Sequence, residues 1–141
     1  MKKFWPYILI ALTVVLAFYP IFQGKIPLNG RNLVSFFSPW IYEKFEGFPA
    51  GVPAKPGMLD PLRQFYPYLS LTQREYRAHR LPLWNPYNFA GNPHQAEWQS
   101  AIYYPLHFLL LVFPLPVYWT IYQMFSFALS ATFTFIFLKK Q

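Results

Sequence analysis

The chain has 141 residues, of which 55% are hydrophobic and 12% are charged, whereas about 25% of the residues of a typical soluble domain are charged. Its net charge is +7, and it has no cysteine, which excludes a disulfide framework and a thiolate metal site. The composition therefore favours a small membrane protein over a soluble globular domain.

Residues 4–22 form an uncharged apolar stretch that follows Lys2 and Lys3. Its length approaches the roughly 20 residues that a helix needs to cross about 30 Å of hydrocarbon. A cleaved signal peptide is the alternative, but its apolar core is shorter and ends in a small-x-small site. Tyr19 and Pro20 close this stretch instead. We expect a transmembrane helix over residues 4–22, preceded by a cytoplasmic N-terminus of residues 1–3.

A second apolar region, residues 98–138, carries no formal charge. As one helix it would be about 60 Å long, twice the thickness of the hydrocarbon core. Prolines at 105, 114 and 116 lack an amide donor and should break it. This pattern predicts a short interfacial helix over 106–113 and a second transmembrane helix over 117–138, with a cytoplasmic end at 139–141.

Lysines flank both predicted spans on the same side, which the positive-inside rule places in the cytoplasm. Residues 23–105 would then form an extracytoplasmic loop, in which the aromatic segment 34–45 is expected at the membrane interface. The expected fold class is an all-α membrane protein with two transmembrane helices. Its long extracytoplasmic loop would contain short interfacial helices.

Within the loop, Asp60-Pro61 marks a helix start, since Asp is a preferred N-cap and proline suits the first helical position. Pro67 should restart that helix, which is expected to run to His79. Pro82 stops it, and residues 81–93 have the composition of consecutive tight turns.

Asp60 is also the strongest candidate for a general base, because Arg63, Gln64 and Tyr66 follow it within two turns. The alternative is that Asp60 only caps the helix. The two roles are compatible, because a capping carboxylate still presents one oxygen outward.

Arg74, Arg77 and Arg80 recur every three residues, which predicts a row along one side of a helix. Such a row could bind lipid-linked phosphate or anionic headgroups, or it could be a solvated face that skims the lipid. Nucleic-acid binding is disfavoured, because little positive charge remains once the four terminal lysines are set aside.

The three histidines show no metal-ligand spacing. Gln95 and Glu97 alternate with other residues and either line a polar cleft or face water. The sequence contains no glycine-rich phosphate loop and no nucleophile elbow.

Several segments together resemble bacterial YfhO-like membrane proteins, which are similar to the GT-C superfamily of polytopic glycosyltransferases. The most specific part is Leu-Pro-Leu-Trp-Asn-Pro-Tyr-Asn-Phe-Ala-Gly at 81–91, followed by Asn-Pro at 92–93 and Tyr-Tyr-Pro-Leu at 103–106. Residues 24–27, 37–40 and 64–67 fit the same pattern, as does Asp60. The resemblance covers nearly the whole chain.

The resemblance implies a transferase that moves a sugar from a polyprenyl-phosphate donor to an envelope acceptor. Asp60 would be the base or a carboxylate that contacts a divalent metal, and no other cofactor is expected. Arg63, or the row formed by Arg74, Arg77 and Arg80, would meet the phosphate. The other candidate substrate-binding residues are Gln64, Tyr66, Trp84, Asn85, Gln95 and Glu97.

Members of this superfamily have about ten or more spans, so the chain is expected to be the N-terminal part of a larger protein. Its expected partners are the lipid bilayer of the bacterial inner membrane, the lipid-linked sugar and the missing C-terminal spans. One alternative is a non-enzymatic envelope protein whose loop binds lipid headgroups or a partner. Another is a gene fragment without independent function.

Overall fold

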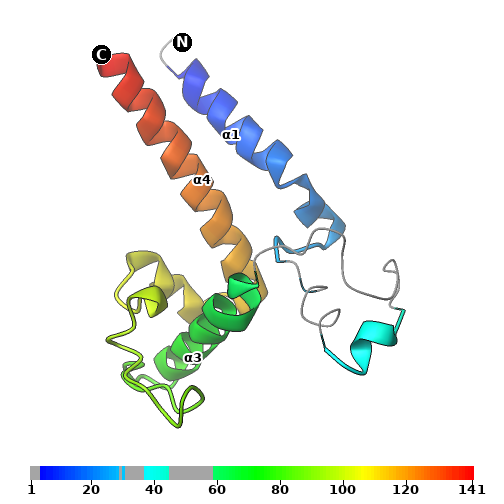
Figure 1. The fold of residues 1–141 in the computed structure, drawn as a ribbon. Coiled ribbons are helices and arrows are strands. Elements are labelled where there is room, and N and C mark those ends of the chain that lie inside the picture. The colour runs from blue at the N-terminus through cyan, green and yellow to red at the C-terminus, as the bar shows by residue number, and fades with distance from the viewer. Residues whose placement is uncertain (1–3, 29, 31–36, 45–58) are drawn as a thin grey trace. The chain divides into compact units, whose positions relative to one another are not determined.

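The computed structural model describes residues 4–28, 30, 37–44 and 59–141, which are mostly helical and contain no strand. The helical class is therefore confirmed for these residues. In chain order the elements are α1 (Trp5–Ala17), η1 (Tyr19–Gln23), η2 (Trp40–Tyr42), η3 (Pro61–Phe65), α3 (Tyr66–Arg77), η4 (Trp98–Ser100), η5 (Pro105–Leu111) and α4 (Leu115–Lys140) (Figure 1). The chain divides into an apolar hairpin, Met1–Pro27 with Val112–Gln141, and a loop unit, Leu28–Leu111.

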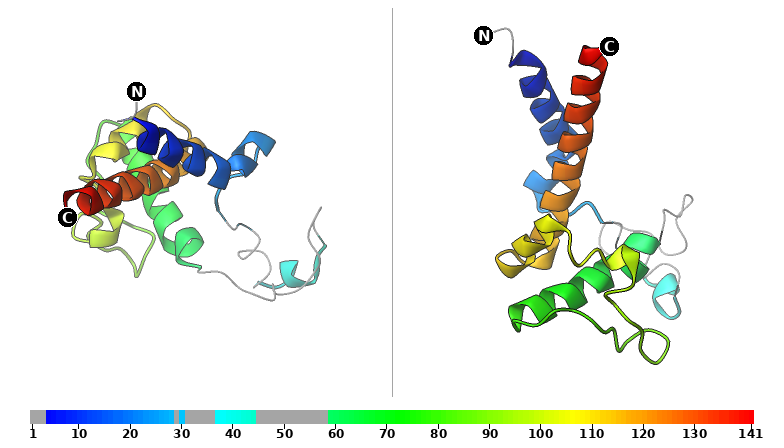
Figure 2. Two further views of the ribbon diagram at one scale, coloured as in Figure 1. Left: turned by 90° about the horizontal axis from the view of Figure 1, so that it is seen from above. Right: turned by 90° about the vertical axis from the view of Figure 1, so that its left-hand side faces the viewer.

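In the apolar hairpin, α1 and α4 run side by side in opposite directions, so that both chain ends lie at the same end of the pair (Figures 1 and 2). Two edge-to-face ring pairs connect the helices. The ring centroids of Tyr7 and Phe135 are 5.7 Å apart, and those of Phe18 and Phe127 are 5.5 Å apart. Such pairs add a specific attraction to the packing of apolar surfaces.

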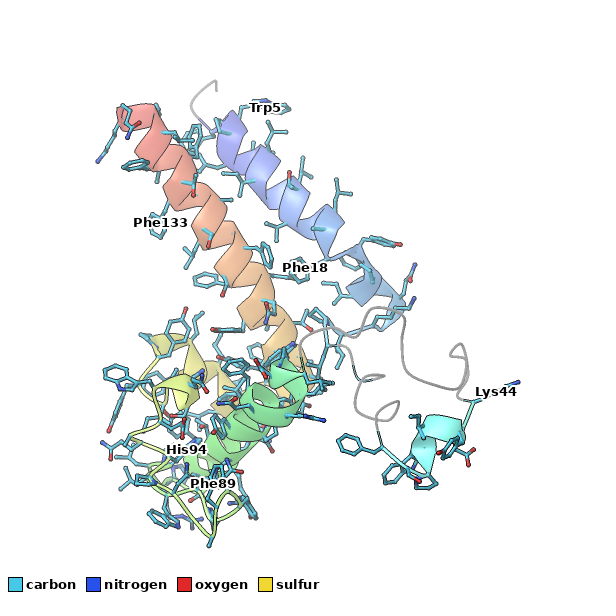
Figure 3. The ribbon with its side chains drawn as sticks, in the orientation of Figure 1. Trp5, Phe18, Lys44, Phe89, His94 and Phe133 are labelled. Carbon is cyan, nitrogen blue, oxygen red and sulfur yellow. The ribbon has the colours of Figure 1, made fainter. Side chains whose placement is uncertain are left out.

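The helix α4 is long and apolar enough to cross a membrane, and its most apolar stretch is not buried. It exceeds the predicted span 117–138 at both ends. Pro116 lies in its first turn, where the missing amide has no helical partner, so the helix begins at Leu115. Lys139 and Lys140 form its last turn, where positive charge interacts favourably with the helix dipole. Exposed rings such as Phe133 project from its surface (Figure 3).

The N-terminal stretch differs from the single helix predicted over 4–22. The helix α1 ends at Ala17, and the chain continues as the 3₁₀-helix η1 to Gln23. Pro20 explains the break, since it lacks an amide donor and its ring crowds the preceding turn. The tighter helix then ends at Gly24, whose φ of 76° is left-handed. The predicted cytoplasmic residues 1–3 lie outside the described residues.

The loop unit is built on α3. Tyr68, Leu69 and Leu71 are buried along this helix, and Ile102 and Leu110 are buried in the segment that returns against it (Figure 2). The returning segment ends in η5, a 3₁₀-helix over Pro105–Leu111 where the sequence predicted a helix over 106–113. The side-chain amide of Gln73 donates to the carbonyl of Leu110 at 2.9 Å, which fastens η5 to α3.

Part of the segment predicted to be interfacial, 34–45, falls outside the described residues. Its described part contains the single turn η2. The location of this segment at a membrane interface stays a prediction.

The end of α3 corrects the predicted helix, which was expected to reach His79. His79 has a φ of 55°, and two backbone bonds close the end: His79 N to Tyr76 O and Arg80 N to Glu75 O, both 2.9 Å. This is the Schellman arrangement, in which a left-handed residue usually occupied by glycine ends the helix. No glycine marks this helix end in the sequence, and for this reason the predicted end lies two residues too late.

Candidate functional site

Asp60 occupies the predicted start of the helix but does not cap it. The residue is exposed, its backbone is already helical (φ −54°, ψ −41°), and its side chain makes no capping hydrogen bond. A capping side chain reaches the first amides from an extended backbone, so the helical conformation of Asp60 explains the difference. The next residues form the five-residue π-helical turn η3, which carries Arg63 and Gln64.

The segment 81–91 is the most specific part of the resemblance. Together with Asn92 it folds back on itself, and we call it the 81–92 turn. The backbones of Asn85 and Asn92 exchange two hydrogen bonds of 2.8 and 2.9 Å. The buried Asn85 side chain accepts a bond from the Tyr87 amide at 2.9 Å, an Asx-type turn. At the tip, Phe89 and Ala90 have φ values of 51° and 61°. Such left-handed φ values are uncommon for residues other than glycine.

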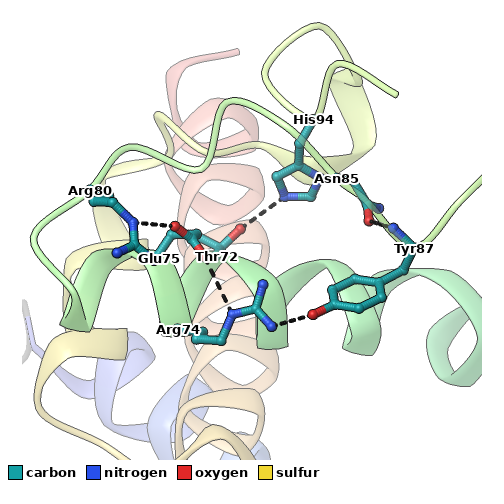
Figure 4. A network of polar contacts seen from close by, with 7 residues as sticks. All are labelled: Thr72, Arg74, Glu75, Arg80, Asn85, Tyr87 and His94. Carbon is teal, nitrogen blue, oxygen red and sulfur yellow. Dashed lines mark hydrogen bonds and ion pairs between the residues drawn. The ribbon is translucent and has the colours of Figure 1, made fainter. Parts of the chain in front are cut away.

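His94 attaches the end of the 81–92 turn to α3. Its imidazole is fully buried, with Nε2 3.1 Å from the Thr72 hydroxyl and its ring edge-to-face with Tyr68 at 5.3 Å (Figures 3 and 4). Burial lowers the pKa of His94, although the charge of Glu97 opposes this effect. The neutral imidazole therefore acts as a structural bridge at pH 7.

Between α3 and the 81–92 turn lies a hollow of about 300 Å³, which we call the arginine hollow. It is lined by Arg63, Pro67, Tyr68, Ser70, Leu71, Arg74, Asn85, Tyr87 and Asn88. None of these described lining residues is acidic. Two guanidinium groups with hydroxyl and amide donors form a donor set that suits an anion, above all a phosphate.

Aromatic rings orient both arginines of the hollow. The guanidinium of Arg63 lies 5.3 Å from the centre of the Phe37 ring. That of Arg74 lies 5.3 Å from the centre of the Tyr87 ring and also donates to the Tyr87 hydroxyl (Figure 4). This hydroxyl is the main reason that the pKa of Arg74 is raised. Arg74 also donates from Nε to the Glu75 carboxylate at 3.3 Å, so two of its nitrogens are already engaged. Both guanidinium groups are therefore oriented before any ligand binds.

The predicted row of three arginines does not form. Arg80 lies beyond the end of α3 and turns back to Glu75, with Nε 2.8 Å from the carboxylate. The Nε of Arg77 donates to the carbonyl of Leu110 at 3.3 Å. The reason is the left-handed turn at His79, which takes Arg80 off the helix. Arg80, and more weakly Arg74, lower the pKa of Glu75.

A second depression, which we call the aromatic hollow, has a volume of about 490 Å³. Gln95 and Glu97, both predicted to contact substrate, line it together with Trp98, Tyr103 and Tyr104. Gln95 donates to the Tyr103 hydroxyl at 2.6 Å, and Glu97 accepts from the Asn92 side chain at 3.2 Å. Gln95 is exposed and Glu97 is half-buried, so both line a depression that is open to water.

The remaining predicted residues do not join either hollow. Gln64 donates to the side chain of Gln99, and Tyr66 is the first residue of α3. Trp84 lies against Gly91, where an added Cβ would come within 2.6 Å of the indole. Among the described residues, no group of three or more His, Asp or Glu side chains could hold a metal ion. A divalent metal at Asp60 stays a prediction.

Sequence reasoning missed the residues that complete the two hollows. Tyr87 and Asn88 line the first, and Trp98 and Tyr103 line the second. Tyr87 and Asn88 lie in the segment that carried the resemblance, so that segment was the available signal. Nothing in the sequence indicated the exposure of Trp98. No family model, curated protein or solved structure matches this chain.

Proposed function

We propose that the chain is the N-terminal segment of a GT-C-like membrane glycosyltransferase, and that its arginine hollow binds the phosphate of a polyprenyl-phosphate-linked sugar. The observation that carries this proposal is that Arg63 and Arg74 line one hollow whose described lining residues include no acid. Glu75, which contacts Arg74 at 3.3 Å, lies outside that lining. The class of enzyme comes from the sequence resemblance alone.

A two-span topology accompanies the proposal, with both termini in the cytoplasm of a bacterial cell and the loop unit outside. The 13 residues of α1 extend about 20 Å. The five residues of η1 add about 10 Å, so that together they approach the roughly 30 Å of a hydrocarbon core. The antiparallel packing of α1 and α4 is consistent with a pair of spans whose chain ends share one side.

In the proposed reaction, guanidinium groups stabilise the negative charge that gathers on the departing lipid phosphate. Asp60 would take the proton of the acceptor hydroxyl. Asp60 and Arg63 are three residues apart at the start of one helical segment. The exposure of Asp60 suits a group that must reach a substrate.

The hollow is tested by measuring the binding of polyprenyl phosphate to the chain in nanodiscs of phosphatidylcholine. Replacing both Arg63 and Arg74 with Gln should weaken binding by at least about a hundredfold, because each charge-assisted pair contributes about 1.5–3 kcal/mol. Arg77→Gln is the matched control, since Arg77 lies on α3 but does not line the hollow, and it should leave binding nearly unchanged. Equal affinities of the double variant and the wild type would overturn the proposal.

Two further arms identify the source of the phosphate. Phosphatidylglycerol nanodiscs and inorganic phosphate should both compete poorly with polyprenyl phosphate. If phosphatidylglycerol competes equally, the loop is a headgroup-binding module and the transferase assignment fails. Asp60→Asn should retain polyprenyl-phosphate binding and abolish sugar transfer by a protein that contains this chain, whereas full transfer by that variant would refute the role of Asp60.

A further inference from the structure

The aromatic hollow has a rigid frame. Ser100 donates to the carbonyls of His94 and Glu97, at 2.7 and 2.6 Å. Ala101 ends η4 with a left-handed φ of 47°, and its carbonyl accepts a 2.8 Å bond from the Tyr104 amide. The hydroxyl of Tyr76 on α3 donates to the carbonyl of Ile102. The backbone around the hollow is therefore fixed from several directions.

On this frame, large rings are left uncovered. Trp98 is 94% exposed and Tyr103 is 64% exposed. An aromatic ring in this position contributes almost nothing to the folded core, because its apolar surface stays in water. Exposed aromatic rings on a rigid frame are typical of surfaces that bind a ligand.

The polar groups of the hollow define the kind of ligand. Gln95 and Tyr103 are already joined by a hydrogen bond, and Glu97 is held by Asn92. A carboxylate has about four acceptor positions and an amide has donors and acceptors to spare, so these groups can still bind several hydroxyls. No described lining residue of this hollow is basic, so an anionic ligand is disfavoured by Glu97.

We propose that the aromatic hollow binds a neutral sugar ring, stacked on Trp98 and hydrogen-bonded to Gln95 and Glu97. The C–H face of a pyranose carries partial positive charge and complements the negative face of an indole, while its hydroxyls match the amide and the carboxylate. Assigning this sugar to the donor of the transferase rests on the proposed function. The binding of a sugar ring by Trp98, Gln95 and Glu97 does not depend on the proposed function.

The test uses the chain in phosphatidylcholine nanodiscs and a panel of methyl glycosides of glucose, galactose, mannose and N-acetylglucosamine, followed by saturation-transfer NMR. At least one glycoside should bind, and Trp98→Ala should weaken its binding about tenfold or more. Phe89→Ala is the matched control, because Phe89 is 95% exposed and lies outside the hollow. Trp98 is so exposed that its removal leaves no cavity, and circular dichroism should be unchanged.

Failure to bind any glycoside, or equal binding by Trp98→Ala, would overturn the sugar site. This outcome is distinct from failure of the proposed function, since Arg63→Gln with Arg74→Gln should keep glycoside binding and lose polyprenyl-phosphate binding. A polyprenyl-phosphate-linked sugar should bind more tightly than polyprenyl phosphate, and Trp98→Ala should remove the gain. Equal affinities of these two lipids would overturn the assignment of the sugar to the donor.

Discussion

A left-handed residue follows a helix in both units, but this residue is glycine in the apolar hairpin and histidine in the loop unit. In the hairpin, η1 ends at Gly24, which adopts a left-handed φ without a steric penalty. In the loop unit, α3 ends at Arg77 and the left-handed His79 follows it, and positive φ values recur at Phe89, Ala90 and Ala101. The loop unit therefore contains strained backbone that the hairpin, among its described residues, does not. Strain of this kind persists where surrounding contacts hold it, and it is concentrated at functional sites.

The two units also differ in chemistry. All five acidic residues and all three histidines of the chain lie between 28 and 111. The hairpin carries only lysine charges, near its ends. Apolar packing and a hydrogen bond from the Trp119 indole to the Pro27 carbonyl, 3.0 Å long, join the two parts of the hairpin. The loop unit adds a larger set of polar side-chain contacts to its buried apolar residues. This difference teaches where perturbations should act: substitutions of turn residues and changes of pH should affect one unit and spare the other.

The largest effect is expected from Gly91→Ala. Gly91 has a φ of 112°, and an added Cβ would lie 2.6 Å from the indole of Trp84. Strain and the displaced indole should together destabilise the loop unit by about 2 kcal/mol. Hydrogen exchange of residues 81–104 in nanodiscs should accelerate, and exchange in α1 and α4 should stay the same.

Two variants separate the clash from the strain. Gly24→Ala has a comparable left-handed backbone, with φ of 76°, and nothing within 4 Å of the added carbon, so it should cost only about 1 kcal/mol. Adding Trp84→Ala to Gly91→Ala should recover part of the loss. A Gly91→Ala chain as stable as the wild type would show that Trp84 does not restrain this turn.

The second effect is a loss of stability of the loop unit in acid. Burial lowers the pKa of His107 to about 4 from an ordinary value of 6.5, a shift that a bond with the Ala101 carbonyl only partly opposes; it also lowers the pKa of His94. The unfolded histidines bind protons more readily, so the stability is complete above pH 6.5 and declines as the pH falls toward 4. Hydrogen exchange measured from pH 7 to pH 4, corrected for the intrinsic rate, checks this.

His107→Gln should reduce the dependence on pH, whereas His79→Gln should preserve it, since His79 is exposed. The hairpin has no group that titrates between pH 4 and 7, so its corrected exchange should be constant over this range. Equal acid sensitivity of the two units would contradict the difference described above.

The smallest effect is expected from His79→Gly. Glycine adopts the left-handed conformation of a helix end more easily than histidine does, so this variant should stabilise the loop unit by about 0.5–1 kcal/mol. His79→Ala, which lacks the enrichment of histidine in that conformation, should not gain stability. Chemical denaturation of the chain in detergent micelles measures both, and a loss of stability in His79→Gly would indicate that the imidazole has a role of its own.

Much of the local structure was predictable because its causes are local. Pro114 separates η5 from α4 as expected, since proline disrupts the interior of a helix, whereas Pro105 and Pro116 lie at helix starts, where a missing amide is tolerated. Pro61 marked the correct start of a helix, because proline suits the first helical position, although Asp60 does not cap it. Pro20 equally encodes the break after Ala17, although the apolar stretch continues through it without a charge. The end of α3 was missed because His79 adopts a conformation that sequence rules assign to glycine.

The sequence by itself determined the helical class, a helix apolar and long enough to cross a membrane, and the concentration of charge between 28 and 111. These properties follow from composition and from proline and charge positions, which act without regard to distant contacts. Only the tertiary structure decided which side chains meet. It removed Arg80 from the expected row of arginines and placed Arg63 and Arg74 around one hollow. It also left Trp98 exposed next to Glu97. Such groupings depend on how the segment after α3 folds back against it, which residues distant in the sequence fix together.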